Sequence, residues 1–324
     1  MKKILRAFLW VLTAFILFFT PVVALKKTGT ANDFPLKTED YKRVLTLWNI
    51  DTFEGGIGSR GDFLSEVLLP LADEGTVVLV SAHTVNSAKE NLSKGVIPDI
   101  VSFGVGADFL APYVRELPFS VFVGGEISGK TYAVPWCRGG YFFISKTEDH
   151  QLIDRLIVSQ GEYNRPVFAL KEEGAEYNSV EFLSPLDAYT AYLSDESATL
   201  LGTQRDIWRL TRRGVSFYAF PAEKFSDLYQ YVAVTTDDEE NYSACVETVR
   251  RLAGIGAKAL ADIGMFGADA NAYDGALGSY DTAKTTLTLS PFTSAEILKD
   301  ADGVAVAAKE ENYYEKIKNT LKHL

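Results

Sequence analysis

The sequence predicts an α/β protein with open, mostly parallel sheets flanked by helices. Short apolar runs at 76–81 and 99–103 are typical of strands that are covered on both faces. Segments with helical spacing of apolar residues, 62–74 and 86–94, alternate with these strands along the chain. The 324 residues are enough for two compact lobes, each with a core of its own.

Near the middle of the chain this alternation stops. Three successive strands separated by Gly-rich turns are expected at 119–123, 131–135 and 141–145. Such a ribbon often links one lobe to another. A helix is expected before it, at 107–116, and another near 151–158, inside the weakly patterned segment 146–180.

The later part of the chain has clearer signals. Ser184 to Asp187 predicts a capped helix, and Thr203 to Asp206 predicts a second one that Gly214 ends. A long helix is expected at 239–253, and a Thr-x-x-Glu pattern predicts a helix at 293–299. A polar terminal helix is expected from about residue 309, and the remaining strands are expected at 198–202, 215–220 and 228–234.

The first 24 residues are predicted to be a secretory signal peptide. Lys2, Lys3 and Arg6 precede an apolar stretch, and Val22-Val23-Ala24 supplies the small residues of a cleavage site after Ala24. The alternative is an uncleaved anchor, because residues 7–24 could barely span a bilayer core of roughly 30 Å. Residues 25–42 are interpreted as a polar tether. In either case the folded part is expected outside the cytoplasm, secreted or held at the outer face of the membrane.

Charge excludes some classes of partner. Without Lys2, Lys3 and Arg6, the 32 Lys and Arg residues become 29 against 43 Asp and Glu residues, a net charge of −14. So acidic a protein is not expected to bind nucleic acid or an anionic membrane surface.

The chain has two cysteines, Cys137 and Cys245. An oxidising compartment would allow them to form a disulfide. Because Cys245 lies on the apolar face of an expected helix, we expect two buried free thiols instead.

Motifs for cofactors, metals and catalysis give little support to an enzyme. Residues 56–61 match G-x-G-x-x-G, but the preceding strand is expected to end near Asn49, too early for a dinucleotide site. His83, His150 and His323 lie in unrelated segments and form neither a catalytic nor a metal-binding pattern. We therefore expect no catalytic residues, no metal and no cofactor. Asp51 and Glu54 leave a glycosidase as a weaker alternative.

Aromatic and planar polar side chains recur together near expected strand ends and helix starts. Flat aromatic faces can pack on the apolar face of a sugar ring, while carboxylate, guanidinium and amide groups pair with its hydroxyls. Open α/β sheets bind ligands at such strand ends. For any one of these residues a structural role is an equal alternative: Trp48 and Trp136 could be core residues, and Asp206 could simply cap its helix. The aromatic members are Trp48, Phe53, Tyr132, Trp136 and Trp208, and the polar members are Arg60, Arg138, Arg205, Asp206, Asp227 and Gln230.

The order of several segments resembles the extracellular solute-binding proteins of bacterial ABC transporters, specifically the sugar-binding family that includes maltose-binding protein. Together the segments cover most of 44–255. They are Leu45-Thr-Leu-Trp48, Phe53-Glu-Gly-Gly-Ile-Gly-Ser-Arg60, Ile97-Pro-Asp-Ile-Val-Ser-Phe103, Gly129-Lys-Thr-Tyr-Ala-Val-Pro-Trp136, Tyr141-Phe-Phe-Ile-Ser-Lys146, Ala198-Thr-Leu-Leu-Gly-Thr-Gln-Arg-Asp-Ile-Trp208 and Phe225-Ser-Asp-Leu-Tyr-Gln-Tyr-Val232.

The resemblance implies two α/β lobes joined by crossing hinge strands, with a ligand held between them. The first lobe would comprise 43–136 and 229–282, and the second 137–228 and 283–324. It further implies a monomer that captures a carbohydrate and presents it to the permease subunits of an ABC transporter. The residues expected to bind it are Trp48, Asp51, Phe53, Glu54 and Arg60 in the first lobe, Trp136 and Arg138 at the crossover, and Thr203, Gln204, Arg205, Asp206, Asp227 and Tyr229.

The chain departs from this family in two respects. It is short, with the shortage at 74–86 and 146–180, and Leu25 stands where Gram-positive relatives carry a lipid-attachment cysteine. An envelope sensor or an anchored scaffold with the same fold is therefore the second hypothesis, and a secreted glycosidase is the third.

Overall fold

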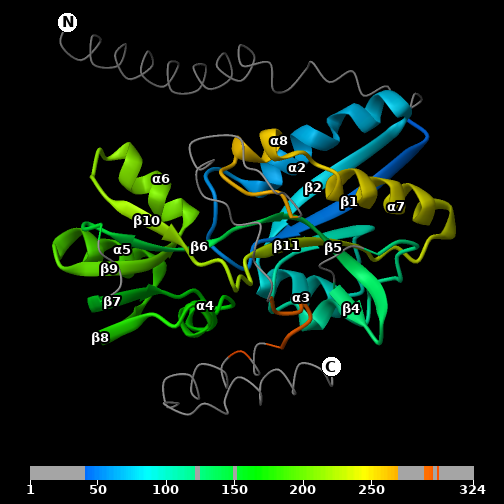
Figure 1. The fold of residues 1–324 in the computed structure, drawn as a ribbon. Helices are drawn as coiled ribbons and strands as arrows, with labels where there is room; N and C mark the ends of the chain where they lie inside the picture. Colours follow the sequence, from blue (N-terminus) through cyan, green and yellow to red (C-terminus); the bar gives the residue numbers. More distant parts are fainter. Residues whose placement is uncertain (1–40, 121–124, 149–151, 269–287, 295–297, 299–324) are drawn as a thin grey trace, which may run out of the picture. The chain divides into compact units, whose positions relative to one another are not determined.

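The computed structural model describes residues 41–120, 125–148, 152–268, 288–294 and 298 (Figure 1). The expected signal peptide, nearly all of the tether and the terminal helix from residue 309 lie outside these residues, as does most of the expected helix at 293–299. No helix within the described ranges has the length and apolar character needed to cross a membrane.

Within the described part of the chain, a first sheet has six strands in the order β2-β1-β3-β11-β5-β4 (Figure 1). Strands β2, β1 and β3 are parallel, whereas β11 runs antiparallel to both β3 and β5, and β4 runs antiparallel to β5. The bounds are β1 Arg43–Ile50, β2 Thr76–His83, β3 Ile100–Phe103, β4 Gly125–Ile127, β5 Lys130–Arg138 and β11 Tyr229–Val234.

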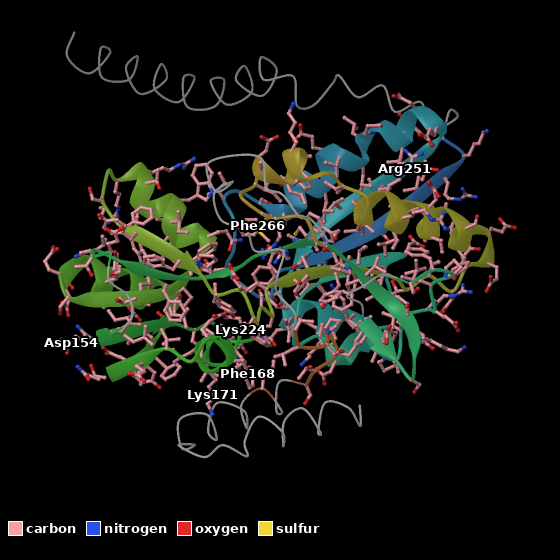
Figure 2. All side chains as sticks on the ribbon, in the orientation of Figure 1. Asp154, Phe168, Lys171, Lys224, Arg251 and Phe266 are labelled. Carbon is pink, nitrogen blue, oxygen red and sulfur yellow. The ribbon has the colours of Figure 1, made fainter. Side chains whose placement is uncertain are left out.

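Alternating side chains bury both faces of this sheet. Leu45 and Leu47 of β1 belong to the core that includes α2 (Arg60–Leu68) and α7 (Glu239–Ala253). Trp48 and Ile50 of the same strand belong to the opposite core, which includes α3 (Val85–Ser93). The two short 3-10 turns are η1 (Leu69–Glu74) and η2 (Asp108–Leu110), and α8 spans Ala257–Ala261. Arg251 of α7, labelled in Figure 2, pairs with Glu74 at 2.7 Å.

The second sheet has five strands over the described residues, in the order β10-β6-β9-β7-β8. The parallel part is β9-β7-β8, and β6 pairs antiparallel with both β9 and β10. Helices α5 and α6 contribute to the core on one face, and α4, which carries Phe168 (Figure 2), to the core on the other. The bounds are β6 Tyr141–Ser145, β7 Leu152–Ser159, α4 Pro166–Glu173, β8 Glu176–Leu183, α5 Pro185–Ser194, β9 Ala198–Thr203, α6 Gln204–Arg212 and β10 Tyr218–Pro221.

Two segments lead from one sheet to the other, and they bond to each other. The first runs from β5 to β6 and the second from β10 to β11. The Gly139 N–H donates to the Leu228 carbonyl at 2.6 Å, which ties the two crossings together. A third segment adds to this hinge, because Arg138 and Phe266 exchange two backbone hydrogen bonds of 2.9 Å each. Strand β5 belongs to the first sheet through Arg138, two residues beyond the expected crossing point.

The segment 288–294 differs from its expected place in the second lobe. The Pro291 carbonyl accepts a hydrogen bond from the Ala107 N–H, and the Phe292 ring lies 5.7 Å from the Phe103 ring of the first sheet. Leu298, in contrast, accepts a hydrogen bond from the Arg165 side chain of the second lobe. This stretch therefore contacts both lobes.

Two expected helices are wrong. The segment expected as a helix at 151–158 forms strand β7 instead. Its spacing of apolar residues also fits a helix, but parallel pairing with β8 and β9 buries it as a strand. The segment 107–116 forms only the turn η2, because Pro112 lacks an N–H and disfavours helical backbone in the residue before it. The expected long helix over 239–253 is confirmed as α7. The expected free thiols are also confirmed, since Cys137 and Cys245 are both buried and unbridged.

Candidate ligand pocket between the lobes

A cavity of about 420 Å³ has walls from both lobes. All of its walls come from loops or helix starts that follow strands at their carboxyl ends. The first lobe contributes the loop after β1, and the second contributes the loop after β7 and the starts of α5 and α6. Because the carboxyl ends of parallel strands gather at one edge of a sheet, this is where open α/β sheets place ligands. The lining residues are Asp51, Thr52, Phe53, Glu54, Gly55, Gly58, Arg60, Gly161, Glu162, Tyr163, Pro185 and Arg205.

Arg60 organises the first-lobe wall. Its Nε donates to the Asp51 carboxylate at 2.7 Å, and its Nη2 donates to the Phe53 carbonyl at 2.7 Å. The guanidinium lies 4.3 Å from the centre of the Phe53 ring. Since Arg60 is only 5% exposed, one buried cation holds a carboxylate and an aromatic ring in the pocket wall.

Two glycines shape the same loop. Gly56 and Gly58 have φ values of 71° and 80°, a region that favours glycine. A side chain at Gly56 would also clash, because its Cβ would lie 2.2 Å from the Ile263 carbonyl oxygen. The glycine-rich run at 56–61 therefore serves a turn that packs against 263–265.

Tyr163 is the aromatic residue of the second-lobe wall. Its ring lies against Gly106 of the first lobe, so close that a Cβ at Gly106 would be 2.3 Å from it. Partial burial, together with the neighbouring Glu162 carboxylate, raises the pKa of the Tyr163 phenol to about 12. Phe53 and Tyr163 thus present aromatic rings from opposite lobes.

An ion-pair cluster joins the lobes beside the cavity. The Glu54 carboxylate lies 3.3 Å from the Arg205 guanidinium and 3.5 Å from that of Arg209. Arg209 also lies 3.4 Å from Asp206. The two arginines of the lining, Arg60 and Arg205, are therefore both paired with acids of the lining.

Two buried polar atoms of the lining residues have no hydrogen-bond partner: Thr52 Oγ1 and Arg60 Nη1. An unpaired buried polar group costs free energy, so both atoms lower the stability of this wall.

Several expected ligand contacts lie away from this cavity. Trp48 packs in the core with its ring 4.5 Å from the His83 ring, and Tyr229 is 2% exposed. Trp136 stacks on Phe63 at 5.8 Å and donates from Nε1 to the Ser102 hydroxyl. Arg138 is buried in the hinge and donates to the Gly267 carbonyl.

The start of α6 has mainly structural contacts. Thr203 and Asp206 form a capping box, with the Thr203 N–H donating to Asp206 at 2.9 Å. Burial raises the pKa of the Asp206 carboxyl group. Gln204 is fully buried and its Oε1 accepts from the Gly140 N–H of the hinge at 3.0 Å. Of this expected group only Arg205 lines the cavity.

The structure thus brings together Asp51, Phe53, Glu54, Arg60 and Arg205 of the expected residues, and adds others that sequence reasoning missed. Glu162 and Tyr163 lie in the weakly patterned segment 146–180, where the sequence predicts a helix in place of strand β7. The signal for Tyr163 is an aromatic residue soon after a strand end. It can be used only if 152–159 is identified as a strand. Thr52 lies between two expected residues, and the sequence pattern at Pro185 predicts only a helix start.

A second hollow, of about 460 Å³, lies wholly on the first lobe. Several of its polar groups already have partners, some of them outside the lining. Arg115 pairs with Glu239 at 2.8 Å and lies 4.0 Å from the Tyr242 ring, while the Tyr242 hydroxyl donates to the Glu116 carbonyl. The interlobe cavity is the better candidate because its walls come from both lobes and lie at strand ends. No group of three or more potential metal ligands occurs among the residues that the structure describes.

Solved structures share this architecture at low sequence identity. The iron-bound HitA protein from Pseudomonas aeruginosa matches with a TM-score of 0.53 and 13% identity, over 81% of this chain and 99% of its own. The maltose-bound MalE3 protein from T. maritima matches with a TM-score of 0.53 and 12% identity, over 87% and 99%.

This chain has the two-lobe fold of the solute-binding proteins. A third similar structure is the galacto-N-biose-/lacto-N-biose I-binding protein of the ABC transporter from Bifidobacterium longum, in complex with lacto-N-biose. It matches with a TM-score of 0.53 and 11% identity over 86% of this chain and 95% of its own. No family model and no curated protein matches the sequence. The expected fold class is therefore confirmed.

Proposed function

We propose that the protein is an extracytoplasmic substrate-binding protein that captures a carbohydrate between its lobes and delivers it to an ABC transporter permease. The observation that carries the proposal is the interlobe cavity, whose lining combines aromatic rings with carboxylates and guanidinium groups. Two of the similar structures are named as sugar complexes and one as iron-bound, so the choice of a sugar rests on the lining of the cavity.

The lining suits a neutral, hydroxyl-rich ligand. The rings of Phe53 and Tyr163 offer apolar surface to a sugar ring, and Asp51, Glu54 and Glu162 offer acceptors to its hydroxyls. The arginines of the lining are already paired with acids, so the cavity has no surplus positive charge for an anion. Its volume falls within the range of roughly 300–1,000 Å³ for small-molecule sites.

In this proposal the protein acts as a monomer with no cofactor, and residues 1–24 direct its export. Each lobe is built on one of the two sheets, and the hinge segments that join β5 to β6 and β10 to β11 allow closure on the ligand.

A thermal-shift and calorimetry screen with neutral mono- and oligosaccharides tests the proposal. A ligand that binds the folded state raises the melting temperature by mass action. We expect at least one sugar to bind, and Tyr163→Ala to weaken its binding by about tenfold or more, because the variant removes an aromatic wall. Tyr177→Ala, at a half-exposed tyrosine of β8 outside the cavity lining, is the matched control and should bind as the wild type does.

Failure of every sugar to bind would overturn the carbohydrate proposal. It would favour the envelope sensor or scaffold, particularly if the first 24 residues proved uncleaved in purified membranes. Turnover of chromogenic glycosides in the same preparation would instead point to a glycosidase.

A further inference from the structure

Asp227 lies in the hinge segment between β10 and β11, and it is 1% exposed. It does not line the cavity. A buried carboxyl group in a hinge is costly unless it is well bonded. Its contacts therefore indicate what it does for the molecule.

Both oxygens of Asp227 accept a short hydrogen bond from the second lobe. The Tyr141 hydroxyl, on β6, donates to Oδ1 at 2.5 Å, and the Arg165 N–H donates to Oδ2 at 2.6 Å. Tyr141 is itself held by Asn164, whose Nδ2 donates to the Tyr141 hydroxyl at 3.1 Å. Asp227, Tyr141, Asn164 and Arg165 are all at most 7% exposed.

These bonds continue into the cavity wall. Asn164 Oδ1 accepts from the Gly161 N–H at 2.7 Å, and Arg165 Nη1 donates to the Glu162 carbonyl at 2.9 Å. Gly161, Glu162 and Tyr163 are the residues of this loop that line the cavity. One continuous set of hydrogen bonds thus runs from the hinge to the wall.

We propose that Asp227 is a positioning residue of the pocket, which ties the hinge to the wall at 161–165 and sets how firmly that wall is held. The inference rests on the proposed function only in taking this cavity as the ligand site.

The environment of Asp227 gives this link a pH dependence. Burial raises its pKa to about 6, although the Tyr141 and Arg165 hydrogen bonds and the Arg165 charge act in the opposite direction. The titratable or charged groups that act on it are Tyr141 on β6 and Arg165 in the loop, and its charge in turn acts on Tyr231 of β11. A hydrogen bond from the backbone of Asp227 itself also lowers its pKa.

Linkage between proton binding and closure of the wall sets the direction of this pH dependence. If the wall moves away, water reaches Asp227 and its pKa falls towards the ordinary value of 3.8. The closed wall therefore binds the proton more tightly than the open wall does. Its extra stability is fully present below about pH 4 and is lost as the pH rises through about 6.

Hydrogen exchange of the full chain, without ligand, tests the proposal. We expect the protection of the 161–165 amides, corrected for the chemical exchange rate, to fall by about tenfold or more between about pH 4.5 and pH 7.5. In Asp227→Asn this pH step should disappear, because the amide does not titrate. Asp195→Asn is the matched control: Asp195 belongs to the same lobe but pairs with Arg155 instead, and its pKa is lowered to about 2, so the step should remain.

A second variant covers the case in which Asp227→Asn fails to fold. Tyr141→Phe removes a donor that favours the carboxylate, so it should move the step to higher pH by about one pH unit. An absent step in the wild type, a step that persists in Asp227→Asn, or an unmoved step in Tyr141→Phe overturns the proposal.

Calorimetry with maltose over the same pH range separates this inference from the proposed function. Maltose binding that weakens as the pH rises, in the wild type only, supports both. If maltose and the other sugars do not bind but the exchange step is present, the carbohydrate proposal fails and the positioning role of Asp227 stands.

Discussion

At the scale of single residues, some side chains around the cavity bring charge into its wall and others hold the wall in place. Arg60 does both, because its guanidinium pairs with Asp51 and supports the Phe53 carbonyl while remaining buried. Thr52 has a different character. Its hydroxyl is buried and has no partner, whereas the buried hydroxyls of Thr235 and Thr248 donate to backbone carbonyls.

A pair of threonine substitutions tests whether the Thr52 hydroxyl contributes to folding. Thr52→Val keeps the shape and removes a hydroxyl that has no partner, so the free energy of unfolding should stay the same or rise by up to about 1 kcal/mol. Thr235→Val is the matched comparison, because the Thr235 hydroxyl donates to the Pro98 carbonyl at 2.6 Å. Removing that donor should cost about 1–3 kcal/mol.

Urea denaturation without ligand measures both changes. Equal losses in the two variants would show that the Thr52 hydroxyl has a partner in the folded protein and would contradict the assignment.

At the scale of elements, the start of α6 is set by a local helix cap and is also attached to the hinge. Thr203 and Asp206 satisfy the free N–H groups at the helix start, as the sequence predicts. The next residue, Gln204, points its amide at Gly140 in the hinge, which fixes α6 to the crossing segment. The helix thereby carries Arg205 to the cavity and Arg209 to Glu54.

Removing the cap hydroxyl should loosen this element. The Thr203 hydroxyl accepts from the Arg205 N–H at 3.3 Å, so Thr203→Ala should lower the free energy of unfolding by about 1 kcal/mol more than Thr203→Ser does. The serine variant also loses the methyl group, so the difference between the two isolates the hydroxyl. Chemical denaturation gives the two values, and equal stabilities would show that the cap adds nothing here.

At the scale of the whole molecule, the relation between the lobes depends on backbone bonds in the hinge and on charges beside the cavity. Glu54 reaches across to Arg205 and Arg209, but all of these groups are partly exposed. Half-exposed ion pairs are worth less than about 1 kcal/mol each. They can therefore bias the opening of the lobes without locking it.

Glu54→Gln should shift the ligand-free protein towards more open forms, by up to about fivefold in population. Small-angle scattering would show this as a larger radius of gyration. Salt at about 1 M should act on the wild type in the same direction, because it shortens the screening length to about 3 Å.

Glu74→Gln is the matched control for this change. It breaks the ion pair with Arg251 inside the first lobe, so it should leave the radius of gyration unchanged. If both Glu54→Gln and high salt leave the wild-type radius unchanged, the interlobe pairs do not hold the lobes together.

The sequence by itself determined the local elements whose signals lie within a few residues of one another. The buried parallel strands, the capped start of α6 and the full extent of α7 follow from apolar periodicity and helix caps, which act locally. Four residues of the first-lobe wall follow from the sequence too, because Asp51, Phe53, Glu54 and Arg60 come soon after a recognisable strand.

Only the tertiary structure decided which aromatic and charged residues face a ligand. Trp48 and Trp136 follow the same apolar pattern as a binding platform would, but the strand alternation turns both into the cores of the first lobe. Tyr163 reaches the cavity because β7 pairs with β8 and β9 over long sequence distances. Asp227 is buried where its own segment meets β6 and the loop after β7, and burial of that kind has no local signature in the sequence.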